Sequence, residues 1–106
     1  MQNKYKYTLS EDLLINVYAL KGIKVDNKWL KVKDCVVFIP KGYSWNGCNF
    51  APDYDETYIA SCVHDACYQY KVNRLKSDKA FKELLSEFKF RKLYYIGVRL
   101  FGWIYF

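Results

Sequence analysis

Hydrophobic and polar positions alternate along the first part of the chain and predict β-strands there. Tyr5, Tyr7 and Leu9 are separated by lysine and threonine, which is the two-residue period of a half-buried strand. A turn at residues 10–12 then leads into a second apolar stretch at residues 13–18. The N-terminal part is therefore expected to begin with two strands.

A hairpin and a continuous apolar run follow. Residues 23–25 and 29–32 are strand-like and flank an Asp-Asn-Lys turn, in which aspartate and asparagine tolerate positive φ. Residues 35–39 are apolar without interruption and stop at Pro40, which is typical of a strand buried on both faces. Together these segments predict a small antiparallel sheet over residues 1–40.

The period changes to that of a helix at Asp55, after a long loop over residues 41–54. Apolar residues then recur at steps of three and four as far as about Lys71. A second helix is expected to start at the capping residue Ser77. Its apolar positions, at i, i+3, i+4 and i+7, are Phe81, Leu84, Leu85 and Phe88.

The C-terminal tail, residues 93–106, is apolar and aromatic but is interrupted by Arg99. A membrane-spanning helix needs about 20 apolar residues. The tail is therefore not expected to be transmembrane, and its aromatic side chains are expected to pack in the core. The prediction is a single α+β domain over residues 1–106, with a strand-rich part (1–40), a loop (41–54) and two to three helices (55–106).

Composition supports a folded domain and favours an acidic partner. Of the 106 residues, 52% are hydrophobic and 20% aromatic, which excludes a disordered chain. The 17 Lys and Arg residues against 11 Asp and Glu give a net charge of +6. Such a charge favours a phosphate-bearing partner, either nucleic acid or an anionic membrane. The basic residues are scattered, so nucleic acid is not specifically indicated.

The cysteines do not form a zinc motif. No two of them are spaced as Cys-x-x-Cys, and the one histidine cannot complete a set of ligands. We expect free thiols, with a bridge from Cys48 to Cys62 as the open alternative. The N-terminus lacks an apolar signal core, so no signal peptide is expected.

The candidate chemistry lies around the only histidine, His64, which directly precedes Asp65 and stands four residues before Tyr68. An imidazole beside a carboxylate on a helix suits acid–base chemistry or metal binding. Neighbours on a helix are about 100° apart, so both side chains can border one groove. We expect the loop at residues 42–52 to form that groove. The alternatives are a structural His64 between helices and an Asp65 paired with Arg74 or a lysine.

Four segments, in order, resemble a family of small tailed-phage and prophage proteins of unknown function. They are residues 42–48, 60–68, 78–81 and 98–102, and they include a His-Asp-x-x-Tyr and an Asp-x-x-Phe motif. The resemblance implies a phage origin, with the host cytoplasm or the virion as the location. It supplies no activity.

The His-Asp-x-x-Tyr helix also resembles the active-site helix of phospholipases A2, most closely the short bacterial and parvoviral forms. This resemblance implies that His64 activates the attacking water, that Asp78 orients His64, and that Asp65 binds Ca²⁺. A metal ion polarises the substrate carbonyl, while the imidazole needs a partner that fixes its tautomer. Loop carbonyls complete the implied calcium site, and the residues concerned are Trp45, Asn46, Gly47 and Cys48, with Tyr68 and Asn46 in supporting roles.

The expected helix boundaries set a condition on the pairing of His64 with Asp78. If the first helix ends near Lys71 and the second begins at Asp78, His64 lies about 10 Å back from the turn. An antiparallel second helix would then place Leu84 opposite His64. The linker over residues 72–76 would have to run back along the first helix for His64 and Asp78 to meet.

Three functions remain open from the sequence. The first is a phage-encoded, Ca²⁺-dependent, phospholipase-A2-like hydrolase that acts on bacterial membrane lipid during genome delivery or lysis, which the positive charge favours. The second is a non-catalytic virion or tail component that packs against other phage proteins through aromatic surface and strand edges. The third is a decoy that binds a phosphorylated ligand or nucleotide through lysines and aromatic rings.

Overall fold

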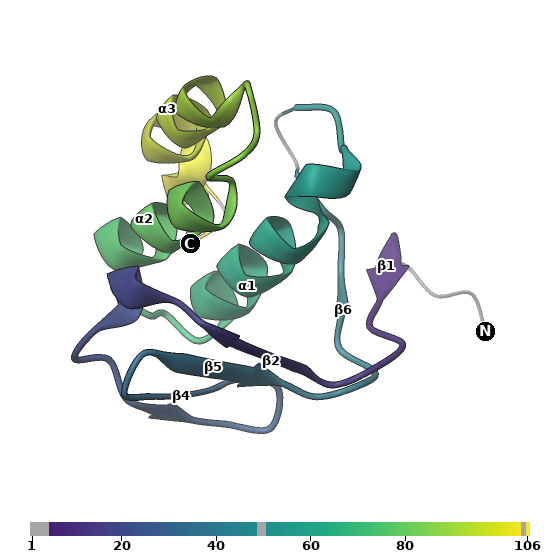
Figure 1. Ribbon diagram of the computed structural model, residues 1–106, viewed down its shortest axis with the longest axis vertical. Coiled ribbons are helices and arrows are strands. Elements are labelled where there is room, and N and C mark those ends of the chain that lie inside the picture. The colour runs from purple at the N-terminus through teal and green to yellow at the C-terminus, as the bar shows by residue number, and fades with distance from the viewer. Residues whose placement is uncertain (1–4, 49–50, 105) are drawn as a thin grey trace.

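The protein is an α+β structure in which helices cover one face of a small sheet (Figure 1). The computed structural model describes residues 5–48, 51–104 and 106. The strands are β1 (Tyr7–Thr8), β2 (Leu13–Asn16), β3 (Val25–Asp26), β4 (Lys31–Lys33), β5 (Val36–Ile39) and β6 (Ser44–Trp45). The helices are α1 (Tyr58–Gln69), α2 (Arg74–Leu84) and α3 (Arg91–Phe101), with 3₁₀ turns η1 (Tyr18–Leu20), η2 (Asp55–Thr57) and η3 (Gly102–Ile104). Strands followed by helices confirm the predicted fold class.

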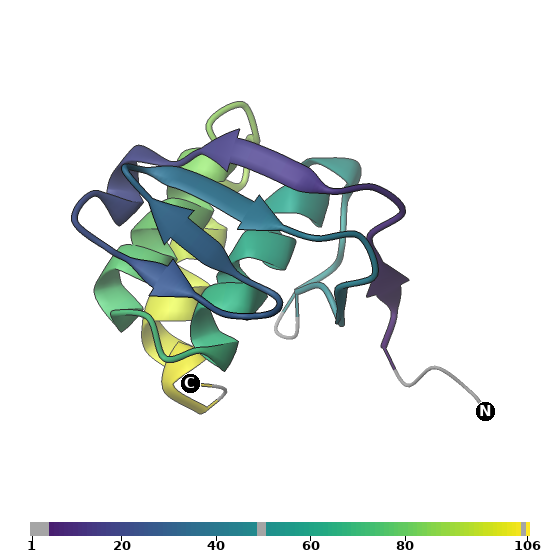
Figure 2. The ribbon, with the colours of Figure 1, turned by 90° about the horizontal axis from the view of Figure 1, so that it is seen from below.

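Four strands form an antiparallel sheet in the order β2-β5-β4-β3 (Figure 2). The predicted hairpin joins β3 to β4, where Val25 pairs with Val32. Its turn is closed by the Asn27 N–H, which donates to the Leu30 carbonyl at 2.9 Å. The turn sequence therefore predicted the hairpin correctly, because it lies between two segments that pair directly with each other.

The prediction that the apolar run at residues 35–39 is buried on both faces is wrong. Val37 and Ile39 of β5 are fully buried, whereas Val36 is exposed. β5 does have a neighbouring strand on each side, β2 and β4. Only one face of the sheet carries helices, however, so the other face remains open to solvent (Figure 2).

The strand β6 lies inside the segment that was predicted to be a loop. Tyr7 pairs with Trp45 and Thr8 with Ser44, so β1 and β6 form a separate two-stranded ladder. The Trp45 ring is buried, and its centroid lies 5.0 Å from that of Tyr58 at the start of α1. Pairing between segments so distant in the sequence leaves no local signature, and the two-residue strand is too short to show a period.

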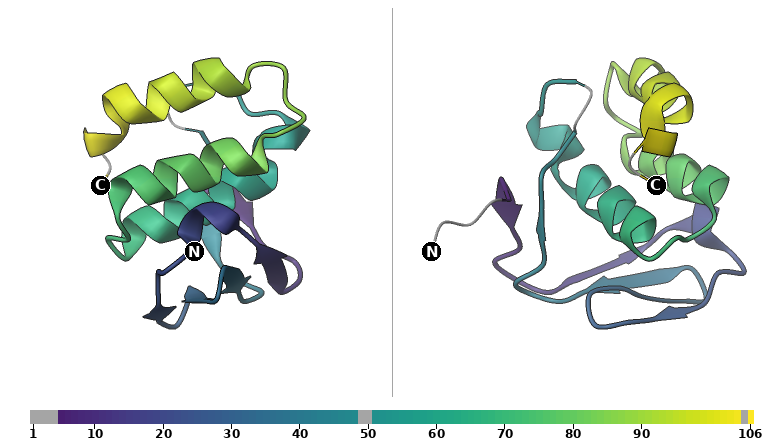
Figure 3. Two further views of the ribbon diagram at one scale, coloured as in Figure 1. Left: turned by 60° about the vertical axis from the view of Figure 1, so that its left-hand side comes forward. Right: turned by 180° about the vertical axis from the view of Figure 1, so that it is seen from behind.

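The helices form a layer that extends away from the sheet (Figure 3). Val63 and Ala66 of α1 share the main core with Val37 of β5. α2 packs beside α1, and α3 packs on α2 on the side farther from the sheet (Figure 3). Tyr94 and Val98 bury the inner side of α3 in a second, smaller apolar cluster. On α3, the Tyr94 hydroxyl also donates to the Pro52 carbonyl of the loop before α1 at 2.5 Å.

The C-terminal apolar residues join the core only in part, through Tyr94 and Val98. Among the described residues, no other element covers the outer side of α3 and η3. Large apolar side chains are therefore exposed there, namely Leu93, Ile96, Leu100, Phe101, Trp103 and Ile104. Within residues 5–48, 51–104 and 106, no helix is both long and apolar enough to cross a membrane.

α2 begins earlier in the sequence than expected. Asn73 is its N-cap, since the Asn73 Oδ1 accepts a hydrogen bond from the Lys76 N–H at 3.0 Å. Ser77, the predicted cap, lies inside the helix, where its hydroxyl donates to the Asn73 carbonyl at 2.9 Å. Lys71, with φ of 59°, turns the chain directly after α1. The connection between α1 and α2 is consequently short, covering residues 70–73.

Candidate active site

The short connection between α1 and α2 brings His64 and Asp78 together. Consecutive helices joined by a short loop pack side by side in opposite directions. His64 and Asp78 lie at similar depths from the turn, so they face each other across the two helices. The Nε2 atom of His64 lies 2.8 Å from Oδ1 of Asp78. Because α2 starts at Arg74, the linker does not need to run back along α1.

The Asp78 carboxylate is fully buried and accepts three hydrogen bonds. Besides His64, the Tyr68 hydroxyl donates to Oδ1 at 2.5 Å, and Nη1 of Arg99 in α3 donates to Oδ2 at 2.8 Å. Nε of Arg74 lies 3.8 Å from Oδ2. Burial alone would raise the pKa of Asp78, but these donors outweigh it and hold the pKa below its usual range. We call these five residues the Asp78 network.

The Asp78 network determines which nitrogen of His64 is basic. An ionised carboxylate can only accept hydrogen bonds, so the Nε2 atom that faces it carries the proton. Nδ1 of the neutral ring then holds the free lone pair, and it lies 4.0 Å from Oδ1 of Asp65. The ring is held in place by two aromatic neighbours, with centroid distances of 4.1 Å to Tyr68 and 5.0 Å to Phe81.

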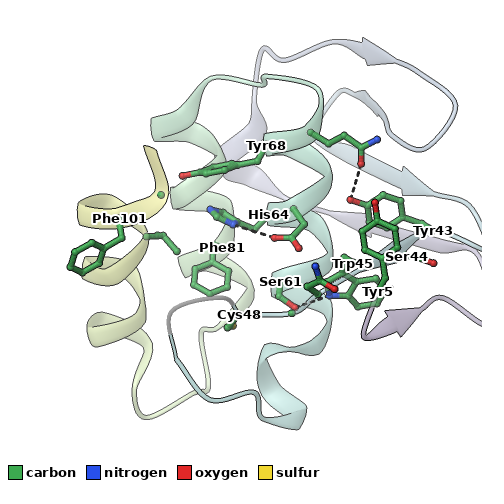
Figure 4. A pocket seen from close by; sticks show the side chains of 16 residues that line it. Tyr5, Tyr43, Ser44, Trp45, Cys48, Ser61, His64, Tyr68, Phe81 and Phe101 are labelled. Carbon is green, nitrogen blue, oxygen red and sulfur yellow. Dashed lines mark hydrogen bonds and ion pairs between the residues drawn. The ribbon is translucent and has the colours of Figure 1, made fainter. Parts of the chain in front are cut away.

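His64 and Asp65 border a cavity of about 230 Å³, which we call the His64 cavity (Figure 4). The segment around β6 forms the wall that faces α1, and it contributes Tyr43, Ser44, Trp45, Asn46, Gly47 and Cys48. α2 and α3 contribute Phe81, Val98 and Phe101. The structure thus places His64, Asp65, Tyr68 and the selected loop residues around one cavity. Asp78 lies behind His64.

Side-chain hydrogen bonds fix the loop that faces His64. Oδ1 of Asp53 accepts from the Cys48 N–H at 2.8 Å, and Oδ2 of Asp53 pairs with the Lys6 ammonium. Oδ1 of Asn46 accepts from the Lys6 N–H at 3.1 Å. Gly47 has φ of +77°, and a Cβ atom at this position would collide with Asp53. The loop therefore keeps its shape only with glycine at this turn.

Asp65 is a carboxylate in the wall of the His64 cavity. In the described part of the chain, the one positively chargeable nitrogen within 4.0 Å of it is Nδ1 of His64. The alternative pairing with Arg74 is not formed, since Arg74 lies against Asp78 and donates to the Val98 carbonyl at 2.9 Å. Burial raises the pKa of Asp65 to about 7. Burial thus makes the charged form of the Asp65 carboxylate less stable, and a bound cation would offset this cost.

The sequence did not identify the two arginines of the Asp78 network. Arg99 stands in one of the segments that resemble the phage family and interrupts the apolar tail. That interruption was the available signal, because a charge within an apolar helix needs a buried partner. The sequence offered Arg74 only as an alternative partner of Asp65, beside a lysine, and not as a partner of Asp78. The cysteines contribute no bridge: Cys35, Cys48, Cys62 and Cys67 are all free, as expected.

Comparisons with known proteins do not assign the chain to a family. It was compared with protein-family models, with curated proteins and with solved structures, and none of the three comparisons gives a match. The geometry of His64 and its neighbours is therefore the basis on which a function can be proposed.

Removing the charge of Asp65 is expected to stabilise the metal-free protein at high pH. Between the ordinary carboxyl pKa near 3.9 and the folded-state pKa of about 7, the folded protein holds a proton that the unfolded chain has lost. The stability contributed by Asp65 is therefore present at low pH and is lost as the pH rises through about 7. The Tm of Asp65→Asn, relative to wild type in chelator, should increase from pH 5 to pH 8.

The matched control for this experiment is Asp26→Asn, because the Asp26 side chain is 87% exposed. Its Tm difference from wild type should not change over the same pH range. A Tm difference for Asp65→Asn that is equally flat would contradict the raised pKa of Asp65.

Proposed function

We propose that this protein is a phage-encoded hydrolase of phospholipid esters in which His64 is the general base. The observation that carries this proposal is the hydrogen bond between Nε2 of His64 and the ionised Asp78. That bond leaves the basic Nδ1 for a water molecule in the His64 cavity. The cavity is lined by both aromatic rings and polar groups, which suits an ester with an apolar chain.

The reaction needs two proton transfers, one from water to His64 and one from His64 to the leaving group. Nδ1 of His64 takes a proton from water as the water oxygen bonds to the ester carbonyl carbon. The imidazolium that forms is stabilised by Asp78, which stays ionised. When the ester C–O bond breaks, His64 returns the proton to the leaving alkoxide. The products are a fatty acid and a lysophospholipid, and the base is regenerated.

The residues present fit a calcium ion at Asp65. Calcium takes oxygen ligands, and Asp65 supplies a carboxylate that burial penalises when it is charged. In the described part of the chain no cluster of three or more His, Cys, Asp or Glu side chains could hold a metal ion. As the resemblance to phospholipases A2 implies, the remaining ligands would be main-chain carbonyl oxygens of Trp45 and Gly47, which line the same cavity as Asp65. When bound, Ca²⁺ would polarise the ester carbonyl and stabilise its oxyanion.

The proposal predicts calcium-dependent hydrolysis of a dispersed short-chain phospholipid. We suggest dihexanoyl phosphatidylcholine below its micelle concentration, so that the assay does not require a membrane surface. Fatty-acid release should occur in Ca²⁺ and stop in chelator. Ca²⁺ should also raise the Tm by mass action, because it binds the folded state.

Two variants separate a specific calcium effect from a general ionic one. Asp65→Asn should abolish both the hydrolysis and the Tm increase. Asp26→Asn, at an exposed carboxylate that does not line the cavity, should keep both. If wild-type protein releases no fatty acid and its Tm does not respond to Ca²⁺, the proposal is wrong. A non-catalytic virion component would then be the better explanation.

A further inference from the structure

The outer side of α3 and η3 presents a continuous apolar surface. Leu93, Ile96 and Leu100 recur at i, i+3 and i+7, which places them on one side of the helix. They are 64%, 52% and 59% exposed, and Trp103 in η3 is 66% exposed. Together with Phe101 and Ile104 these residues form what we call the α3 apolar face. An exposed apolar surface of this kind marks an interaction site.

The chain segment that contains α3 carries charge of one sign. The sequence from Phe88 to its end contains no aspartate or glutamate. Lys89, Arg91 and Lys92 lie at the N-terminal end of α3, and Lys92 is exposed one turn before Ile96. Long basic side chains beside an apolar helix face can reach anionic headgroups while the apolar side chains enter the lipid.

The α3 apolar face is continuous with the His64 cavity. Phe101 borders that cavity, and it also borders an apolar groove with Leu93, Ile96 and Leu100. Figure 4 shows Phe101 on α3, on the far side of Phe81 and His64 from the β6 wall. A lipid surface that contacts this face would therefore lie beside the cavity.

We propose that the α3 apolar face docks on an anionic lipid bilayer, with α3 lying in the plane of the interface. Apolar, aromatic and basic side chains without acidic ones are the pattern of an interfacial helix. A second copy of the chain is a poorer occupant, because a two-fold contact would bring the basic residues of both copies together. Docking itself requires no hydrolysis, so it stands or fails separately from the proposed function.

The experiment measures cosedimentation with vesicles of phosphatidylcholine, alone or mixed with phosphatidylglycerol. It uses His64→Ala protein in chelator, which avoids lipid turnover. Binding should be much stronger to the mixed vesicles. Leu100→Asp should weaken that binding about tenfold or more, the loss expected when one leucine no longer enters an apolar phase. Leu14→Asp is the matched control, since Leu14 is 69% exposed on β2 and carries the same charge change.

A second pair of measurements tests the charge. Lys92→Gln should weaken binding about fivefold on vesicles that contain phosphatidylglycerol, as expected for one basic residue near an anionic surface. It should have no effect on pure phosphatidylcholine. Leu100→Asp and Lys92→Gln should both keep the Tm of the parent protein, because these side chains are exposed.

Three results would overturn docking. The first is equal binding by Leu100→Asp and Leu14→Asp, and the second is no binding to either vesicle. The third is a dimer in solution that Leu100→Asp dissociates, since the face would then belong to a second copy. If hydrolysis of the dispersed short-chain lipid persists while vesicle binding is absent, docking alone is wrong. If vesicle binding persists without hydrolysis, docking is supported and the catalytic proposal is wrong.

Discussion

Replacing His64 with alanine is expected to reduce hydrolysis of the short-chain phospholipid by about 10²–10⁴-fold, the usual contribution of a general base. The physical reason is that Nδ1 of His64 is the basic nitrogen that the Asp78 network leaves unprotonated beside the cavity. The effect should appear in kcat/KM at saturating Ca²⁺. Circular dichroism should show that the secondary structure is retained.

His64 is largely buried, so His64→Ala also leaves a space between Tyr68 and Phe81 and is expected to lower the Tm. His64→Gln separates the two effects. Its amide N–H can still donate to Asp78, but the amide has no basic lone pair at neutral pH. We expect His64→Gln to be more stable than His64→Ala and equally inactive. Activity that follows the Tm across both variants would instead make His64 a structural residue.

Asp78→Ala is expected to cause the largest loss of stability among the carboxylate substitutions, about 3 kcal/mol of unfolding free energy. Removing this buried carboxylate leaves His64, Tyr68 and Arg99 without their acceptor. We place the value at the lower end for a broken buried ion pair, because the Arg99 and Arg74 side chains are 34% and 24% exposed and can reach water. Urea unfolding followed by circular dichroism measures it.

Two further variants give reference values for the loss of unfolding free energy in Asp78→Ala. Asp26→Ala, at an exposed carboxylate 3.5 Å from Lys31, should change the unfolding free energy by less than about 0.5 kcal/mol. The loss of unfolding free energy for Asp78→Asn should lie between those for Asp78→Ala and Asp26→Ala. The amide oxygen can accept a hydrogen bond from some of the donors around it, but the amide N–H groups then face another donor. Similar values for Asp78→Ala and Asp26→Ala would show that the network contributes little to folding.

Features of the chain that depend on neighbouring residues could be read from the sequence. The two-residue period predicted strands, the Asp-Asn-Lys turn predicted the hairpin, and the change of period at Asp55 predicted the helices. The candidate site was found in the same way, because His64, Asp65 and Tyr68 stand on one short helix. Side-chain placement on such an element follows from its own geometry.

Contacts between distant segments were decided by the tertiary structure. β6 exists because Trp45 pairs with Tyr7 and packs on Tyr58. Arg99 joined the site because α3 packs on α2 and sets its guanidinium against the buried Asp78. Neither contact has a period or a spacing that marks it in the sequence.

The pairing of His64 with Asp78 depended on both the sequence and the tertiary structure. The sequence by itself supplied the two residue types, while a shift in where α2 begins, set by the Asn73 cap, decided that they face each other. The outer side of α3 likewise depended on both the sequence and the tertiary structure. Its apolar pattern was evident from the sequence, but whether Leu93, Ile96 and Leu100 were buried depended on whether another element covered them. Among the residues that the structure describes none does, because α3 lies at the outer edge of the helical layer.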